Sequence, residues 1–201
     1  MARRVELIFD FVSPNAYLIW HPLREVLKRT GAGLDVIPVF LAGMHRLTGN
    51  APPMIRDKEV KGKVEYGMLE FQRFIAKHNL AHFRMNPKFP FNSILLQRML
   101  FAADQDGRAV QLIETLLPAI WENEVDATDP EAIAQVLSDG GFDAQDLLGR
   151  AGSDEVKQGL VDSTSEAVER GAFGIPTIFV GNEMFFGKER LAQIEEELEK
   201  H

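Results

Sequence analysis

Clusters of apolar positions divide the chain into a β-rich beginning, a long helical middle and a β-rich end. Residues 4–11 are largely apolar and rich in β-branched and aromatic side chains, which is typical of a buried parallel strand. Ser13-Pro14 follows at once and favours a helix start, because serine suits the N-cap and proline suits the first helical position. We expect this helix to end at the glycines 31 and 33, with a kink or a broken start at Pro22.

A second strand is expected directly after that helix. Residues 34–40 read Leu-Asp-Val-Ile-Pro-Val-Phe and have the composition of a strand. Pro38 favours an edge position or the end of the strand, because proline has no N–H group for a ladder hydrogen bond. A strand, a helix and a strand in this order predict a compact βαβ unit with parallel strands and a right-handed crossover.

The middle of the chain has apolar residues at helical spacing. Residues 43–57 are rich in glycine and proline and predict a loop, and Asn86-Pro87-Lys88-Phe89-Pro90 predicts a second one. Thr128 or Asp129 is the expected N-cap of the helix near 130–138. The helices predicted from the spacing lie at about 58–78, 92–105, 108–122, 130–138 and 143–149, and from Ser153 onward.

The end of the chain returns to β structure. Residues 177–180 predict a strand, Gly181-Asn182 suits a two-residue hairpin turn, and residues 183–186 predict an antiparallel partner strand. A last amphipathic helix follows. The element order, βαβ, helices, ββα, predicts an α/β fold. In it a large all-helical domain, residues 43–171, is inserted into a domain that is made of residues 1–42 and 172–201.

Composition narrows the functional classes. The chain has 201 residues, of which 45% are hydrophobic, enough for one domain that carries a large insertion. Its 22 Lys and Arg against 30 Asp and Glu give a net charge of −8, so we expect no general attraction to nucleic acid or to an anionic membrane. The first apolar run is broken by Glu6 and Asp10, which argues against a signal peptide and favours a cytoplasmic protein.

The chain contains no cysteine. This excludes disulfides, cysteine nucleophiles, dithiol redox chemistry, cysteine-ligated iron–sulfur clusters and thiolate zinc sites. His78 and His82 are four residues apart, but no acidic residue stands between them in the pattern of a zinc protease, and we expect no metal site. The chain also lacks the glycine-rich loops that bind nucleotides.

Ser13 is the first candidate for chemistry. It lies where a strand leads into a helix, so unpaired N–H groups and the positive end of the helix dipole surround it. Such a place binds anions and stabilises thiolates. Because the chain has no thiol, a thiolate would have to arrive on a ligand, and the serine hydroxyl could donate a hydrogen bond to it. The alternative is that Ser13 is only an N-cap.

Gly174-Ile175-Pro176-Thr177, directly before the third strand, is the second candidate. If the Ile175–Pro176 peptide bond is cis, the Ile175 N–H and C=O groups turn outward and can pair with an extended, peptide-like ligand. The alternative is a trans proline in a loop.

Together these segments carry a family resemblance. Residues 9–18, Phe-Asp-Phe-Val-Ser-Pro-Asn-Ala-Tyr-Leu, resemble the first motif of the 2-hydroxychromene-2-carboxylate isomerase family, and residues 171–177 and 181–191 resemble its C-terminal signature. Residues 49–66 resemble the family more loosely. That family is related to kappa-class glutathione transferases and to the disulfide oxidoreductases of the thioredoxin fold. The resemblance implies a thioredoxin-like domain with an inserted helical domain, glutathione as cofactor, and a homodimer.

The resemblance also implies roles for single residues. Ser13 would hold the glutathione sulfur as a thiolate, and the backbone of Ile175 beside cis-Pro176 would hold the cysteinyl unit. Asn50 and Pro53 would lie where the insertion closes over glutathione. The turn 187–190 would face the γ-glutamyl end. There the relatives carry Gln or Asn followed by Asp, whereas this chain has Lys188 and Glu189, so the acid reaches one methylene further and a new positive charge is added.

The family's reaction interconverts 2-hydroxychromene-2-carboxylate and trans-o-hydroxybenzylidenepyruvate. A thiolate that adds to the conjugated double bond, and leaves after rotation, makes this isomerisation possible without net redox change. The substrate carboxylate would meet a cation, for which Lys61, Lys63, Arg84 and Lys88 are candidates. Two alternatives remain: a kappa-like glutathione transferase or peroxidase, and a non-redox peptide-binding protein of the same fold.

Overall fold

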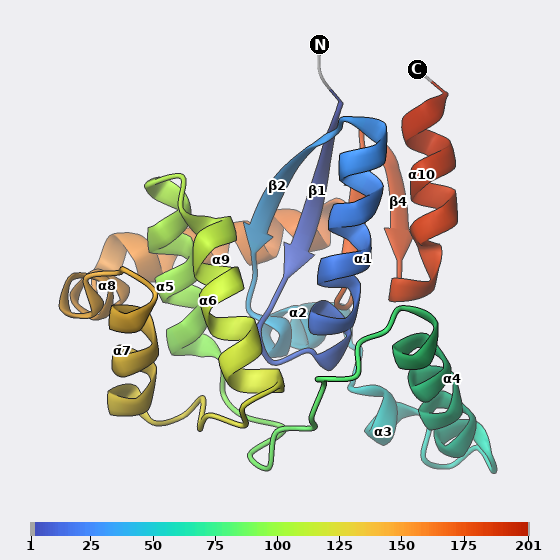
Figure 1. Cartoon of the computed structure of the whole chain (residues 1–201), viewed down its shortest axis with the longest axis horizontal. Coiled ribbons are helices and arrows are strands. Elements are labelled where there is room, and N and C mark those ends of the chain that lie inside the picture. Colours follow the sequence, from blue (N-terminus) through green and yellow to red (C-terminus); the bar gives the residue numbers. More distant parts are fainter. Residues whose placement is uncertain (1–2, 201) are drawn as a thin grey trace.

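Four strands form the sheet at the centre of the molecule, in the order β2-β1-β3-β4 (Figure 1). The structure is a computed structural model that describes residues 3–200. Positions 1, 2 and 201 of the predicted domain ranges therefore lie outside the described residues. The strands are β1 (Arg4–Phe9), β2 (Gly33–Pro38), β3 (Thr177–Val180) and β4 (Glu183–Phe186).

The mixed pairing of β1 explains how the two ends of the chain build one sheet. β1 runs parallel to β2, with Val5 opposite Leu34, and antiparallel to β3, with Ile8 opposite Thr177. Leu7, Ile8 and Phe9 are fully buried, as the apolar run predicts for a central strand. β2 is an edge strand that ends at Pro38, so the predicted edge position is confirmed.

Helices cover both faces of the sheet. Figure 1 shows α1 (Pro14–Thr30) and α10 (Leu191–Glu199) in front of the sheet and α9 (Asp154–Glu169) behind it. Of the kink or broken start predicted at Pro22, the broken start is wrong, because α1 runs without interruption from Pro14 to Thr30. Proline removes only one hydrogen bond, and the buried side chains of Ile19 and Leu23, four residues apart on either side of it, keep the same face of the helix on the core.

The chain between β2 and β3 is helical and lies in two groups (Figure 1). α3 (Pro53–Arg56) and α4 (Lys63–Lys77) lie beyond the end of β4, whereas α5 to α8 pack beside β2. The other helices of this segment are α2 (Leu41–Thr48), α5 (Ile94–Gln105), α6 (Ala109–Trp121), α7 (Pro130–Asp139) and α8 (Ala144–Ala151). Of the two predicted candidates Thr128 and Asp129, Asp129 is the N-cap of α7, and its carboxylate accepts a hydrogen bond from the N–H of Glu131.

The loop predicted over residues 43–57 is wrong, because α2 and α3 lie there. Gly43 is inside α2, where an added Cβ would come within 3.3 Å of the Phe40 ring and 3.8 Å of Thr164 in α9. The glycine therefore permits close packing and does not mark a turn. The helix expected from about residue 58 begins only at Lys63, because Gly62 adopts the left-handed conformation with φ +82°.

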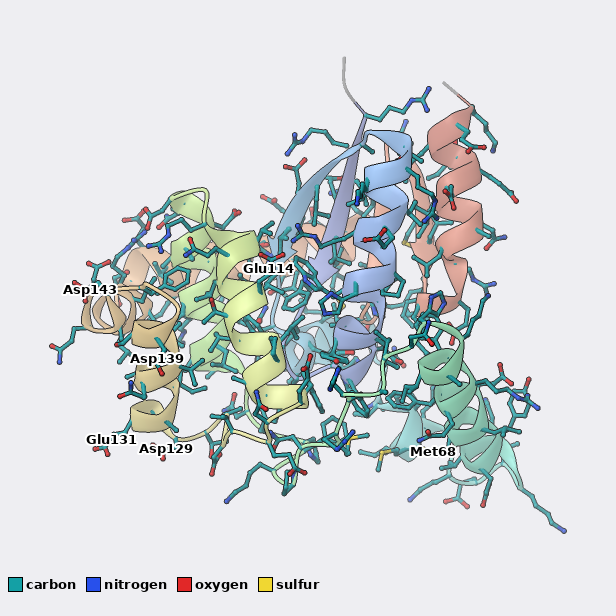
Figure 2. All side chains as sticks on the ribbon, viewed as in Figure 1. Met68, Glu114, Asp129, Glu131, Asp139 and Asp143 are labelled. Atoms are coloured by element: carbon teal, nitrogen blue, oxygen red, sulfur yellow. The ribbon has the colours of Figure 1, made fainter. Side chains whose placement is uncertain are left out.

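Acidic side chains lie on and around α6, α7 and α8. Figure 2 labels five of them, Glu114, Asp129, Glu131, Asp139 and Asp143. Across residues 3–200, no group of three or more acidic or histidine side chains is arranged to hold a metal ion. None of the helices within that range is both long and apolar enough to cross a membrane.

Candidate active site

A tight turn joins β1 to α1 and places Ser13 at the helix start. The Ser13 N–H donates to the carbonyl of Asp10 at 3.2 Å, and the Val12 N–H donates to the Asp10 carboxylate at 3.0 Å. Ser13 has the extended conformation of an N-cap, with φ −84° and ψ 114°, and is only 5% exposed. The strand-to-helix junction expected from Ser13-Pro14 is therefore present.

The Ser13 hydroxyl does not cap the helix. It makes no hydrogen bond to the first turn, which distinguishes it from Ser153, whose hydroxyl accepts from the N–H of Val156. The first turn holds no acidic residue, Pro14 has no N–H group, and the Asn15 N–H has no partner within residues 3–200. A free hydroxyl and a free N–H at the positive end of α1 can both donate to an anion.

Two buried side chains from the helical segment fix the backbone that leads to Ser13. The Gln97 amide donates to the carbonyls of Phe9 and Val39 at 2.8 Å each and accepts from the Phe11 N–H at 3.2 Å. The Trp121 indole N–H donates to the Phe11 carbonyl at 3.0 Å. Every one of these bonds is shielded from water, so the Ser13 turn is held rigidly by residues far away in the sequence.

Asp10 is a fully buried acid directly beneath this turn. Besides the Val12 bond, its carboxylate accepts from the Leu41 N–H at 2.8 Å and from the Ser93 hydroxyl at 3.0 Å. Burial raises the pKa of Asp10 to about 6, although these hydrogen bonds act in the opposite direction. The sequence interpretation did not select Asp10 as a site residue. The available signal was an acidic residue that ends an apolar strand just before Ser13-Pro14.

The Ile175–Pro176 peptide bond is cis, which resolves the alternative left open by the sequence. Neither the N–H nor the C=O of Ile175 has a hydrogen-bond partner among the residues described. Because Ile8 lies opposite Thr177, the chain that leaves β1 toward Ser13 runs beside the chain that enters β3 through Pro176. Ser13 and Ile175 thus lie at the same end of the sheet.

The loop before β3 is connected to two other predicted site segments. Asn50 donates through its side-chain amide to the carbonyl of Phe173 at 2.7 Å. The N–H of Gly187, which precedes Lys188, donates to the carbonyl of Pro176 at 3.0 Å. These hydrogen bonds join Asn50, Pro176 and the 187–189 turn in one neighbourhood. Pro53 begins α3 on the exposed surface, and no hydrogen bond ties it to this loop.

Lys188 and Glu189 form an ion pair of unequal exposure. The Lys188 ammonium donates to the Glu189 carboxylate and lies 5.8 Å from the ring centre of Phe71 and 5.3 Å from that of Phe74, both on α4. The Lys188 side chain is 8% exposed and that of Glu189 is 49% exposed. Glu189 is therefore open to a ligand, whereas Lys188 holds the turn and α4 together from inside.

The cations predicted to meet a substrate carboxylate have different surroundings. Lys63 pairs with Asp57 at 2.9 Å; together with Arg56 it holds the pKa of that carboxyl well below its usual range. Arg84 donates to the carbonyls of Ala81 and Phe83. Lys61 is exposed and has no ion pair within the described range, and Lys88 pairs with Asp126 at 3.3 Å. No contact joins any of these four cations to Ser13 or Ile175 in the structure.

An aromatic wall begins one helical turn after Ser13. The ring of Phe83 lies 5.4 Å from that of Tyr17 and is stacked at 5.9 Å on Trp121. The Tyr17 hydroxyl donates to Glu122 at 3.0 Å, and burial together with this carboxylate raises the pKa of Tyr17, so the phenol stays protonated. Sequence reasoning missed Glu122, because its partner is 105 positions away.

Comparison with known proteins shows which proteins the chain is similar to. The family model of the DsbA-like thioredoxin domain matches residues 4–199. The 2-hydroxychromene-2-carboxylate isomerase of Pseudomonas sp. (strain C18) is 28% identical over 194 residues, which are 95% of this chain and 88% of the relative. The glutathione S-transferase kappa 1 of Homo sapiens is 26% identical over 209 residues, covering 95% of this chain and 88% of the relative.

A solved structure extends the comparison to three dimensions. The structure of a 2-hydroxychromene-2-carboxylate isomerase superposes with a TM-score of 0.81 at 25% identity, covering 96% of this chain and 93% of that chain. The resemblance seen in the end motifs and the thioredoxin-like α/β fold with its helical insertion are thereby confirmed. The chain belongs to the family of DsbA-like thioredoxin domains.

Proposed function

We propose that this protein is a glutathione-dependent isomerase of the 2-hydroxychromene-2-carboxylate type. The observation that carries the proposal is a set of three polar groups at one end of the sheet that have no partner within the described part of the chain. These are the Ser13 hydroxyl at the start of α1 and the main-chain N–H and C=O of Ile175. The names of the relatives from Pseudomonas and Homo sapiens support isomerase or glutathione-transferase chemistry.

The free groups suit the central part of glutathione. The Ser13 hydroxyl and the Asn15 N–H would donate to the sulfur, and the dipole of α1 would favour its ionised form. The N–H and C=O of Ile175 would pair with the backbone of the cysteinyl unit, as in the addition of a strand. When bound, glutathione supplies a thiolate that adds to a conjugated double bond and leaves after rotation, so total glutathione stays constant.

The outer parts of glutathione would meet Asn50, Pro53 and the turn after β4. Asn50 is already tied to the carbonyl of Phe173, which brings α2 and its following loop over the Ile175 segment. Glu189 would accept from the γ-glutamyl ammonium, because its carboxylate is half exposed. Lys188 would act from behind and fix the position of Glu189.

The acceptor would be a small aromatic carboxylate. The wall made by Tyr17, Phe83 and Trp121 offers ring faces for stacking. Arg84 follows Phe83 directly, and its guanidinium has more N–H groups than the two carbonyls occupy. Arg84 is therefore our first choice for the substrate carboxylate, ahead of Lys61 and Lys63, which lie just before and at the first residue of α4 and have no contact with the aromatic wall.

A kappa-like glutathione transferase or peroxidase is the second candidate, favoured by the kappa-class relative. The same Ser13 and Ile175 groups would activate and hold glutathione in both cases. Product analysis separates the two activities, because an isomerase leaves the total amount of glutathione unchanged and a transferase consumes it. The absence of cysteine excludes a dithiol oxidoreductase of the usual kind.

We further propose a cytoplasmic homodimer. The cytosol maintains a large pool of reduced glutathione. α3, α4 and the turn between them expose large apolar side chains, which favour burial against a second protein surface. They are Met54, Ile55, Val60, Tyr66, Met68 and Leu69. Light scattering coupled to size-exclusion chromatography tests the dimer directly.

Calorimetry tests the cofactor first. Glutathione is titrated into wild type and Ser13→Ala between about pH 6 and about pH 9, the range in which a perturbed thiol ionises. We expect wild type to bind with release of protons and Ser13→Ala to lose that release. Addition of 2-hydroxychromene-2-carboxylate then tests turnover. Absence of binding at millimolar glutathione would overturn the proposal in favour of a peptide-binding protein, and binding without turnover would favour the transferase.

A further inference from the structure

The buried carboxylate of Asp10 joins three separate segments at the site. One oxygen, Oδ1, accepts from the N–H of Val12 in the Ser13 turn. The other, Oδ2, accepts from the N–H of Leu41 at the start of α2 and from the hydroxyl of Ser93, the residue before α5. α2 leads directly to Asn50, so one side chain holds both the Ser13 turn and the helix that precedes another proposed ligand contact.

The donors around Asp10 require that both side-chain oxygen positions act as hydrogen-bond acceptors. A backbone N–H cannot reverse its direction, and each carboxylate oxygen faces one of them. An amide in place of the carboxylate would therefore turn its NH₂ group toward an N–H in either orientation. Ser93 differs, because its hydroxyl can rotate and either donate or accept. The arrangement thus favours a carboxylate specifically, and hydrogen bonds to an ionised acceptor are stronger and shorter than neutral ones.

We propose that Asp10 is a positioning residue for Ser13, whose ionised carboxylate holds the turn between β1 and α1 so that the Ser13 hydroxyl stays at the helix N-terminus. This inference deepens the proposed function, because it assigns the group that sets the geometry of the thiol-binding serine. Asp10 itself touches no ligand, since it is fully buried beneath the turn.

A pH dependence follows from the burial of Asp10. Burial raises its pKa to about 6, and the groups that act against this are the Val12 and Leu41 N–H groups and the Ser93 hydroxyl; no charged side chain of the described residues contributes. Below that pH the carboxyl is protonated and its two N–H bonds become weaker neutral ones. Between about pH 6 and about pH 4, Asp10 binds a proton in the folded chain but not in the unfolded chain. Protonation of Asp10 in this interval therefore does not destabilise the folded state. The site should therefore loosen near pH 6 without global unfolding.

A thiol introduced by Ser13→Cys reports the geometry without any ligand, because the chain has no other cysteine. Its pKa is measured from the ultraviolet absorbance of the thiolate, alone and combined with Asp10→Asn. If Asp10 positions the turn, Asp10→Asn moves the sulfur away from the helix end and raises the thiol pKa by about one unit, a tenfold loss of ionisation. If Asp10 were merely a nearby negative charge, the same substitution would lower the thiol pKa, and the proposal would be overturned.

Nuclear magnetic resonance of the wild-type chain supplies a second, independent measurement. The amide signals of Val12, Ser13 and Leu41 should titrate with one shared midpoint near pH 6. Ser93→Ala removes a donor from the ionised carboxylate and should move that midpoint to higher pH while both N–H bonds remain. This variant carries the test if Asp10→Asn does not fold. Amide signals that do not titrate together would contradict the proposal.

The two proposals fail in different ways. A thiol pKa that rises with Asp10→Asn, in a protein that does not bind glutathione, would support the positioning role and remove the cofactor. Binding of glutathione by wild type, with an unchanged thiol pKa in Asp10→Asn, would support the cofactor and remove the positioning role. Circular dichroism at each pH verifies that the chain remains folded in every comparison.

Discussion

The electrostatic character of the helix start at position 13 can be tested directly by Ser13→Cys. Sequence and structure place this position at the positive end of a 17-residue helix whose first turn has no acidic residue. A partial charge of about +0.5 at roughly 5 Å, with an effective dielectric constant of about 20, stabilises a thiolate by about 1.7 kcal/mol. That corresponds to a decrease of about 1.2 in the pKa.

Two local effects adjust this value in opposite directions. The unpaired N–H of Asn15 would donate to the thiolate, and a charge-assisted hydrogen bond lowers the pKa by about one further unit. Position 13 is only 5% exposed, and loss of hydration raises the pKa by a similar amount. We therefore expect a thiol pKa of about 7 to 7.5, against about 8.5 for an unperturbed cysteine.

Ser138→Cys is the matched control, because Ser138 lies in the last turn of α7, at the negative end of a helix dipole and beside Asp139. Its thiol pKa should be about 8.5 or higher. Both variants are titrated by thiolate absorbance from about pH 5 to about pH 10. Equal pKa values at the two positions, or a higher value at position 13, would show that burial outweighs the helix end and would refute the reasoning.

Three further predictions concern the frame around the site. Gln97→Leu leaves the buried Phe11 N–H and Val39 carbonyl without partners, whereas the Phe9 carbonyl still accepts from the Val39 N–H; it should lower the free energy of unfolding by about 2 kcal/mol or more, measured with urea, and an unchanged midpoint would contradict this. Gly159→Ala places a Cβ 2.3 Å from the Phe101 ring and should destabilise by about 1–3 kcal/mol in thermal unfolding, unlike the unobstructed Gly149→Ala. Lys188→Met removes the ammonium that pairs with Glu189 and packs against the Phe74 ring of α4. Amide hydrogen exchange should therefore become faster in α4 and stay constant in α9.

Local signals were sufficient for most elements and for both motifs that build the site. Ser153 and Asp129 cap helices that begin where the sequence places them, because a capping side chain acts within three residues of its position. Ser13-Pro14 and Pro176 are also local signals, because proline restricts the backbone at its own position and favours the first position of a helix or of a strand. The exceptions are Gly43 and Pro22, which lie inside helices that packing against the rest of the molecule maintains.

The long-range hydrogen bonds that hold the site in place could not be predicted from local signals. Asp10 and Ser93 are 83 positions apart, and Gln97 and Phe9 are 88 apart, so no periodicity or spacing rule connects them. Burial makes each of these hydrogen bonds strong, and burial is a property of the folded chain. The unpaired state of Ile175 likewise became visible only when every neighbouring donor and acceptor had a position.

The amino-acid sequence by itself determined the βαβ start and the ββα end of the chain, the start of α1 at Ser13-Pro14 and the absence of any thiol, because these depend on residue identity and on neighbours within one helical turn. Tertiary structure alone decided which polar groups remain free and which are occupied. Among residues 3–200, it left the hydroxyl of Ser13 and the main chain of Ile175 without partners, and it enclosed Asp10 and Lys188. The physical reason is that hydrogen bonding and desolvation depend on distances in space, which the chain establishes only when it folds.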